Sequence, residues 1–474
     1  MTPRNRTGAA AGGLAAALIS LALLAGGCTE ATGGVRGTPG TAGLRDPYFP
    51  KLGNGGYDVR HYALTLAYDP GSGRLDGTAE ITARATQDLS AFNLDLAGLT
   101  VDRASVDGAP AAVNRAGNEL TLRPREEIRE GAEFRTVVRY AGVPEAITDA
   151  DGSEEGWLRT ADGAVAVGQP AGSMTWFPGN HHPSDKAAYE LTLTVPAGLE
   201  AISNGVRTSR RTTADGRVTS VWQAPEPMAS YLATVAIGRY ETEETGGKGN
   251  ASTTTAPVLT AAERSVADAS AALRGEIPEI LARQTRRFGP YPFSTAGAIV
   301  TADGTLGYAL ETQTRPVFPA ASFDRTTLVH ELAHQWFGNS VSPATWRDLW
   351  LNEGFATYAE WLYTEEFEHV PARTHFERAF AQDANWAFSP ADPPSAENLF
   401  DPPVYQRGAM VLHKLRETVG DATFDRILRG WPAKYRHANA STADFTAYAE
   451  SVAGRDLDAL WDVWLYGDGR PESP

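Results

Sequence analysis

A short segment of this chain carries the residues of a metal site that can activate water. The segment reads His330-Glu331-Leu332-Ala333-His334. On a helix, His330 and His334 lie one turn apart on the same face, so their imidazole nitrogens can converge on one cation. Glu331 lies beside them, where its carboxylate can take a proton from a water molecule. The pattern predicts a hydrolytic metal centre with Glu331 as its general base.

Glu353 supplies the third side chain that a catalytic zinc ion requires. Catalytic Zn²⁺ is held by three protein ligands, and a fourth position stays open for water or substrate. Eighteen residues separate His334 from Glu353, and the surrounding segment 346–360 is apolar enough to form a second buried helix. We therefore expect His330, His334 and Glu353 to bind one Zn²⁺, which this His/His/Glu set favours over other metals.

Glu360 extends this pattern beyond the ligands themselves. It lies seven residues after Glu353, which is two helical turns further on and on the same face. A carboxylate there can accept the second N–H of a liganding histidine and fix its tautomer. A five-residue motif alone also arises by chance on surface helices that bind no metal. The apolar surroundings of the histidines, including Trp336 and Phe337, favour the buried metal site over that alternative.

Beyond these residues, the chain resembles the M1 family of zinc aminopeptidases, gluzincins related in architecture to thermolysin. The resemblance is carried by H-E-L-A-H-Q-W-F-G-N, W-R-D-L-W-L-N-E-G-F-A and V-Y-Q-R-G-A, and more weakly by W-F-P-G-N-H-H-P-S-D-K-A and A-L-E-T-Q-T-R-P. It extends from about residue 50 to near the C-terminus. What it implies is hydrolysis of the first peptide bond of peptides that have a free N-terminus.

The resemblance gives Tyr405 a catalytic role. This residue matches the tyrosine that the family places just before its R/K-G-A helix start. When water attacks a peptide carbonyl, negative charge develops on the carbonyl oxygen, and zinc together with a phenolic O–H would stabilise it. A tyrosine that only packs in the core is the alternative.

The resemblance also implies a site for the α-ammonium group of the substrate. Glu311 lies where the family has the glutamate of G-x-M-E-N, and a carboxylate there would form a charge-assisted pair with the ammonium. The chain departs from that pattern, because Tyr308 replaces the glycine, Leu310 the methionine and Thr312 the asparagine. Gln169 resembles the polar residue that the family's N-terminal domain contributes to the same ammonium. A loop glutamine without this role is the alternative.

The other histidines do not predict a second metal site. His181 and His182 are adjacent, and adjacent side chains on an extended chain point to opposite faces. We expect both in a structural turn. His61 and His413 have no ligand-like spacing and are expected to be ordinary surface or core residues.

The N-terminus predicts export from the cytoplasm. Arg4 and Arg6 precede an apolar stretch at residues 14–24, and A-G-G-C follows, ending at Cys28. This pattern resembles a bacterial lipoprotein signal peptide that spans residues 1–27. The apolar stretch is shorter than the roughly twenty residues that span a bilayer. A secretory signal whose cysteine is incidental is the alternative.

A lipid on Cys28 would anchor the protein to the outer face of the bacterial cell membrane. Residues 28–47 are rich in Gly, Thr, Ala and Pro without periodicity, so we expect a flexible linker there. Cys28 is the only cysteine in the 474 residues, and no disulfide can form within the chain. The formal net charge of −16 argues against nucleic acid or anionic lipid as a partner.

The rest of the chain predicts two domains of roughly two hundred residues each. Residues 48–243 show short alternating strands separated by turn residues, which indicates an all-β domain. A polar, Gly-containing boundary at 241–250 separates it from a catalytic domain at 250–474. The clearest expected strands are 61–68, 77–83, 134–140, 189–195 and 296–300, and the expected helices are 261–288, 325–337, 351–367, 408–419 and 443–452.

By resemblance, the fold is multidomain, with a saddle-like all-β domain followed by a thermolysin-like, mainly α-helical (α+β) catalytic domain. The large C-terminal helical domain of longer family members is expected to be missing, which would leave a more open cleft. Two other functions stay possible on the residues alone. One is a zinc hydrolase of a non-peptide substrate such as an epoxide, and the other is an inactive lipoprotein that binds peptides.

Overall fold

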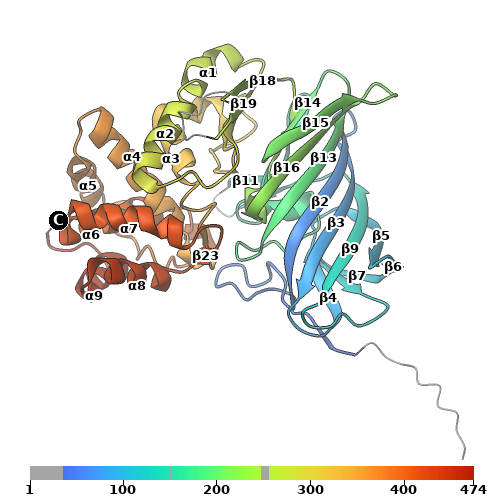
Figure 1. The fold of residues 1–474 in the computed structure, drawn as a ribbon, viewed down its shortest axis with the longest axis horizontal. Helices are drawn as coiled ribbons and strands as arrows, with labels where there is room; N and C mark the ends of the chain where they lie inside the picture. Colours follow the sequence, from blue (N-terminus) through green and yellow to red (C-terminus); the bar gives the residue numbers. More distant parts are fainter. Residues whose placement is uncertain (1–35, 150–151, 247–255, 474) are drawn as a thin grey trace, which may run out of the picture. The chain divides into compact units, whose positions relative to one another are not determined.

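The computed structural model describes residues 36–149, 152–246 and 256–473. Within these residues, a domain of β-strands is followed by a domain of helices, as Figure 1 shows. The expected signal peptide, with Cys28, and the first part of the expected linker lie outside the described residues. None of the described helices is both long enough and apolar enough to cross a membrane.

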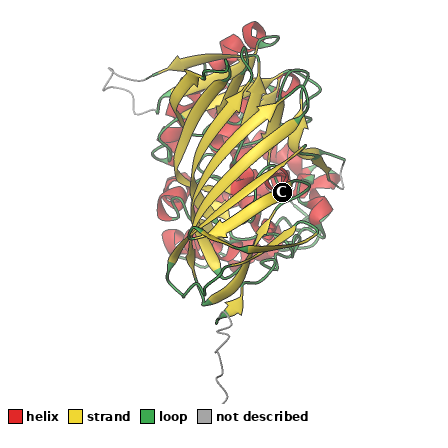
Figure 2. Ribbon diagram, turned by 90° about the vertical axis from the view of Figure 1, so that its right-hand side faces the viewer, coloured by secondary structure: helices red, strands yellow, loops and turns green. Residues whose placement is uncertain are grey.

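The first domain is built on an eight-stranded sheet of the described residues, which Figure 2 draws face on. Buried and more exposed residues alternate along β2 (Tyr57–Asp69), β3 (Arg74–Ala85) and β13 (Lys186–Val195), as expected for a sheet with one covered face. The strand order is β15-β16-β13-β2-β3-β9-β5-β6, with β5 at Thr100–Val106, β6 at Ala109–Pro110, β9 at Glu133–Gly142, β15 at Val206–Thr212 and β16 at Val218–Ala229. The four strands predicted for this domain all lie within β2, β3, β9 and β13.

Two smaller sheets complete the first domain. One has the order β1-β4-β8-β7, with β1 at Thr38–Pro39, β4 at Leu89–Asp95, β7 at Ala112–Ala116 and β8 at Glu119–Arg123. The other has the order β10-β11-β12-β17-β14, with β10 at Ala146–Thr148, β11 at Glu154–Arg159, β12 at Ala164–Val167, β14 at Glu200–Ser203 and β17 at Val235–Gly238. All four residues of β12 are buried, so this sheet lies between two layers of the molecule.

The second domain combines a small sheet with a cluster of helices. The sheet has the order β18-β19-β20-β21, with β18 at Tyr240–Thr245, β19 at Val258–Glu263, β20 at Ala296–Thr301 and β21 at Val317–Pro319. The helices are α1 (Ala267–Arg274), α2 (Ile277–Phe288), α3 (Arg325–Ala333), α4 (Trp350–Phe367), α5 (Ala372–Phe380), α6 (Gly408–Val419), α7 (Asp421–Lys434), α8 (Thr442–Ala453) and α9 (Asp458–Leu460). Four of the five predicted helices correspond to α3, α4, α6 and α8.

The sequence prediction is wrong at the start of the second domain. The expected helix 261–288 begins as β19 and continues as two separate helices, α1 and α2. The expected boundary 241–250 begins with β18, which pairs antiparallel with β19 and therefore belongs to the second domain. Because β18 is an edge strand whose side chains from Glu241 onward are exposed, its polar composition resembles that of a linker.

Close packing fixes α4 against its neighbours. A Cβ atom at Gly354 of α4 would lie 2.9 Å from the Cα of Gly408 in α6, so only glycines permit these two helices to approach this far. On another side of α4, the ring of Phe355 stacks on Phe337 with a centroid distance of 4.5 Å. These contacts determine where the residues next to Gly354 lie.

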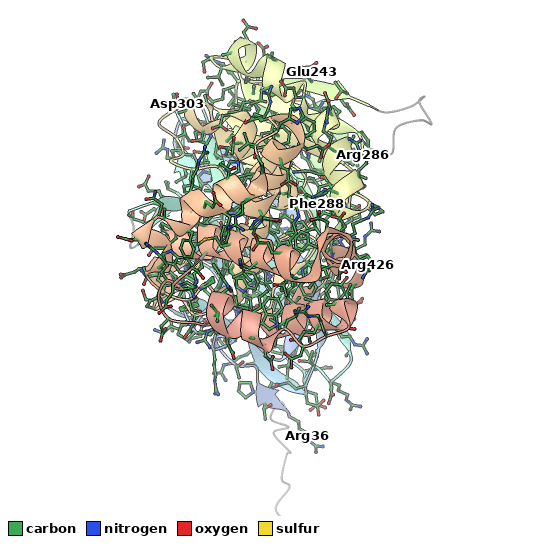
Figure 3. The ribbon with its side chains drawn as sticks, turned by 90° about the vertical axis from the view of Figure 1, so that its left-hand side faces the viewer. Arg36, Glu243, Arg286, Phe288, Asp303 and Arg426 are labelled. Carbon is green, nitrogen blue, oxygen red and sulfur yellow. The ribbon has the colours of Figure 1, made fainter. Side chains whose placement is uncertain are left out.

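The helical layer also holds the C-terminal end of α3. Figure 3 looks onto this layer, in which Arg286 of α2 is exposed while Phe288, two residues later, is buried. The Phe288 ring lies 5.7 Å from Trp336 and 5.1 Å from Phe337, measured between ring centroids. The turn that follows α3 is therefore anchored in an aromatic cluster.

The segment before the first long strand is packed between the domains. Asp46 is only 2% exposed, and its Oδ1 accepts the N–H groups of Tyr48 and Phe49. Its Oδ2 accepts the N–H of Trp346 at 2.9 Å and lies 3.2 Å from Nε2 of His182. The described end of the expected flexible linker is thus part of the fold, and the linker prediction is too long there. His182 contributes to structure in this position.

The carboxylate of Asp46 is stabilised in its charged form. Burial alone would raise its pKa, but the hydrogen bonds from His182 and from three backbone N–H groups outweigh burial and lower the pKa below 3.8. This lowered pKa means that ionised Asp46 stabilises the folded state.

We expect Asp46→Ala to lower the free energy of unfolding by about 3 kcal/mol, because several buried donors lose their acceptor. Urea denaturation followed by tryptophan fluorescence measures this. When the pKa of a carboxyl group is lower in the folded than in the unfolded state, the group stabilises the fold at pH values above the unfolded-state pKa. This stabilisation is lost as the pH falls through the folded-state pKa. The difference in the free energy of unfolding between the wild type and Asp46→Ala should therefore be largest at neutral pH and shrink only below pH 3.8.

The control is Asp76→Ala, which removes an exposed ion pair with Arg74 and should cost less than about 1 kcal/mol. Equal stability of the Asp46 and Asp76 variants at neutral pH would contradict the role of Asp46 as a junction between the domains.

Candidate active site

The three predicted ligand side chains meet where α3 and α4 pack together. His330, His334 and Glu353 each offer a ligand atom, and these atoms lie within 4.8 Å of one another. Nε2 of either histidine is 3.3 Å from Oε2 of Glu353. Two imidazole nitrogens and one carboxylate oxygen at this spacing fit the donor set of a catalytic zinc ion, with a fourth position open. The residues present therefore fit the predicted metal.

The end of α3 determines where the two histidines point. The helix begins after Asp324, whose side chain accepts the N–H of Thr327 as an N-cap at 3.0 Å. It ends at Ala333, four residues earlier than predicted, so His334 is the first residue of the following turn. Its backbone N–H still donates to the His330 carbonyl at 3.2 Å, which keeps both side chains on one face.

Both histidines have an acceptor on the ring side away from the metal position. Nδ1 of His330 lies 2.6 Å from Oε1 of Glu360, the residue predicted to orient a ligand. Nδ1 of His334 lies 3.0 Å from the carbonyl oxygen of Phe337. An Nδ1–H that donates to such an acceptor leaves the lone pair on Nε2, which is the nitrogen that faces Glu353 in each case.

Glu331 is buried beside the ligands and faces the same cleft. Its side chain is 6% exposed, and its Oε2 has no hydrogen-bond partner among the described residues. Burial raises the pKa of Glu331 to about 7, against the opposing effect of the two neighbouring histidines. An oxygen without a protein partner in this position is available to a reacting molecule.

Glu311 and Gln169 come from different domains and bind each other. Nε2 of Gln169, in the loop after β12, donates to Oε1 of Glu311 at 2.9 Å, and both side chains are buried. Burial raises the pKa of the Glu311 carboxyl. The pair therefore places a carboxylate and an amide side by side, as expected for a site that receives a cationic group.

Two residues that support this pair were not identified from the sequence. Glu155 is fully buried, and its carboxylate accepts the N–H groups of Ala171 and Gly172, just after Gln169. Asn339 donates from Nδ2 to the backbone oxygen of Glu311 at 2.6 Å. The sequence of β11 does not distinguish Glu155 from an exposed glutamate. Asn339 is the last residue of the motif H-E-L-A-H-Q-W-F-G-N, so the motif could have identified it as a site residue.

Tyr405 lies just before α6 and lines the same cleft as the ligand residues. Its ring is parallel to that of His330 within 21°, at a centroid distance of 6.3 Å. Tyr405 belongs to the π-helical turn Pro403–Arg407. Arg407 fixes this turn, because its guanidinium is buried and donates to the carbonyl oxygens of Trp464 and Phe388.

All predicted site residues within the described part of the chain line one cleft of about 980 Å³. They are His330, Glu331, His334, Glu353, Glu360, Glu311, Gln169 and Tyr405. The first domain contributes Gln169 and Glu154 to its wall, and the second contributes Tyr308 among others. His61, His181, His182 and His413 lie outside this cleft, as the sequence predicts.

Known families match both domains. The Peptidase M1 N-terminal domain model matches residues 59–232, and the Peptidase family M1 domain model matches residues 320–464. Aminopeptidase M1-A of Oryza sativa subsp. japonica is 28% identical over 457 residues, which cover 87% of this chain and 50% of that protein. Leucyl aminopeptidase of Saccharolobus solfataricus is 27% identical over 329 residues, which cover 61% of this chain and 39% of that protein. The chain spans about half the length of its plant relatives.

Solved structures are similar over both domains. The M1 zinc metallopeptidase from Deinococcus radiodurans is 30% identical, with a TM-score of 0.85 over 91% of this chain and 98% of that chain. A mutant of that metallopeptidase bound to a Tyr-Ser-Ala substrate has a TM-score of 0.84 and is covered completely. The likeness therefore extends over both domains of the fold.

We expect the purified protein to contain about one zinc per chain and His334→Ala to lose it, because one of three ligands is removed from a buried site. Elemental analysis of the protein measures this directly, without reference to activity. His375→Ala, at a half-buried histidine bonded to Thr364 in the same domain, is the control and should keep its zinc. Full zinc content in His334→Ala would remove His334 from the ligand set.

Proposed function

The chain belongs to peptidase family M1, and on that premise we propose that it is a zinc aminopeptidase that hydrolyses the first peptide bond of peptides with a free N-terminus. The observation that carries this proposal is the buried pair of Glu311 and Gln169 in the same cleft as the metal residues. A buried carboxylate in this position is suited to pair with the α-ammonium group of a free N-terminus. The family's relatives that are aminopeptidases support the same function.

In this proposal, Glu331 moves the protons. His330, His334 and Glu353 would hold a zinc ion, which would supply Lewis-acid polarisation of the scissile carbonyl and lower the pKa of water. Glu331 takes a proton from the attacking water as its oxygen bonds to the carbonyl carbon, and it passes a proton to the leaving amine as the C–N bond breaks. The oxygen of Glu331 that has no protein partner is suited to this transfer.

Tyr405 and the interdomain pair position the substrate around this chemistry. The Tyr405 hydroxyl would donate a hydrogen bond to the carbonyl oxygen as negative charge develops on it. Glu311 would accept from the α-ammonium group. Because Gln169 already donates its N–H to Glu311, its amide oxygen is left to accept from the same ammonium.

We also propose that the enzyme is exported and anchored to the outer face of the cell membrane through a lipid on Cys28. The charged start, the apolar stretch and the A-G-G-C sequence support this proposal. Growth with labelled palmitate should label the wild type, and Cys28→Ser should carry no label and appear in the medium. A wild type that is released into the medium without label would show that the cysteine is incidental.

The function is tested with aminoacyl-coumarin amides whose amino group is free or acetylated. The wild type should cleave the free form and lose nearly all activity on the acetylated form, because acetylation leaves the buried carboxylate without a cationic partner. Comparable rates on both forms would contradict the aminopeptidase proposal. No cleavage of any amide by zinc-loaded protein would favour a non-peptide substrate or a binding function.

Replacing each of two cleft glutamates by glutamine distinguishes substrate binding from the chemical step. Glu311→Gln should raise KM for free-amine substrates more than it lowers kcat, since it removes a charge partner of the ground state. Glu331→Gln should lower kcat by at least about 10³-fold while zinc content stays at that of the wild type. Steady-state kinetics with elemental analysis distinguish them, and equal kcat values in the two variants would refute the assignment of the base.

A further inference from the structure

Tyr308 departs from the family pattern and crosses the substrate cleft. It stands where G-x-M-E-N has its glycine, three residues before Glu311. Its hydroxyl donates to the carbonyl oxygen of Glu154 at 3.1 Å, and Glu154 is the first residue of β11 in the other domain. Its ring packs against the core and lines the cleft. A glycine at this position could make none of these side-chain contacts.

The contact made by Tyr308 lies at the same end of the cleft as the pair of Glu311 and Gln169. β11 and β12 are antiparallel neighbours, and Gly156 pairs with Val167. Glu154 and Gln169 each lie two residues beyond that pair, at the same end of the two strands. The segment 308–311 therefore meets β11 and the β12 loop through two hydrogen bonds of 3.1 Å and 2.9 Å.

We propose that Tyr308 is a specificity-determining residue whose ring closes the cleft beyond the ammonium site and limits it to one residue before the scissile bond. The inference rests on the aminopeptidase function proposed above. The observations behind it are that the Tyr308 ring lines the cleft between the segment 308–311 and β11, packs against the core and is held at its hydroxyl by Glu154. In this proposal, a chain that continued past the α-ammonium would meet the ring there.

This closure is physically distinct from the attraction exerted by Glu311. The carboxylate favours a free ammonium through charge, so a blocked substrate binds less well but still has room. A fixed aromatic ring excludes the extra atoms by shape, which penalises blocked and extended substrates even where charge is satisfied. Removing the ring while keeping Glu311 therefore tests the second effect alone.

The experiment compares kcat/KM for a free aminoacyl-coumarin amide and its acetylated form, using full-length zinc-loaded enzyme. Tyr308→Ala should raise the ratio of acetylated to free activity by about tenfold or more over the wild type, because shape exclusion is lost. Tyr308→Phe keeps the ring and removes the hydroxyl that bonds Glu154, and its ratio should lie closer to the wild type than to Tyr308→Ala. Identical ratios in the Phe and Ala variants would overturn the assignment to the ring.

The matched control is Tyr48→Ala. Tyr48 also joins the two domains, since its hydroxyl donates to the carbonyl oxygen of Pro393 at 2.7 Å, but it does not line the cleft. The ratio of acetylated to free activity in Tyr48→Ala should equal that of the wild type. A rise as large as that in Tyr308→Ala would show that loosening of the domains is the cause, and would overturn the inference.

Zinc content and thermal stability identify variants that have lost the fold. If Tyr308→Ala loses zinc, Tyr308→Leu, which removes the ring but keeps an apolar side chain, takes its place in the same comparison. A folded variant that keeps the wild-type ratio would refute the role of Tyr308 and leave the aminopeptidase function standing. A wild type that cleaves both substrates equally would instead refute the proposed function.

Discussion

The packing of α4 between α3 and α6 is the constraint on which the site depends. Glu353 lies next to Gly354, where the backbone touches that of Gly408, and two residues before Phe355, whose ring stacks on Phe337. Phe337 in turn accepts from Nδ1 of His334 through its carbonyl oxygen. One set of close contacts therefore fixes the third ligand and the orientation of the second. A shift of α4 by the width of one methyl group would separate the ligand atoms, since dense interiors transmit such changes.

The same contacts gather negative charge in a buried place. Glu311, Glu331 and Glu353 are all less than 7% exposed and line one cleft. Carboxylates held together away from water repel one another, and this repulsion is offset by a divalent cation that the histidines help to bind. Binding of Zn²⁺ therefore relieves the repulsion among these buried carboxylates.

The sequence predicted those parts of the protein whose pattern is local. The spacing of His330 and His334 identifies one face of a helix from the sequence alone, and the bounds predicted for α6 agree with those observed. The start of the second domain was mistaken because β18 is a polar edge strand, whose partner β19 is separated from it by more than ten residues. Glu155 was missed for the same reason, because only the folded chain brings its carboxylate to the N–H groups after Gln169.

The residues proposed for catalysis and those proposed to select which peptide bond is cleaved lie in different parts of the structure. The three metal-site residues and Glu331, the proposed base, all lie on α3, the turn after it and α4, so they belong to one domain. The residues proposed to recognise the N-terminus meet across the two domains, through Gln169 with Glu311 and Glu154 with Tyr308. A substitution such as Tyr308 for glycine can therefore change which bond is presented while the metal site stays the same. Because each of these two contacts is a single hydrogen bond with a net strength of about 1–3 kcal/mol, selectivity can change in small steps without loss of the fold.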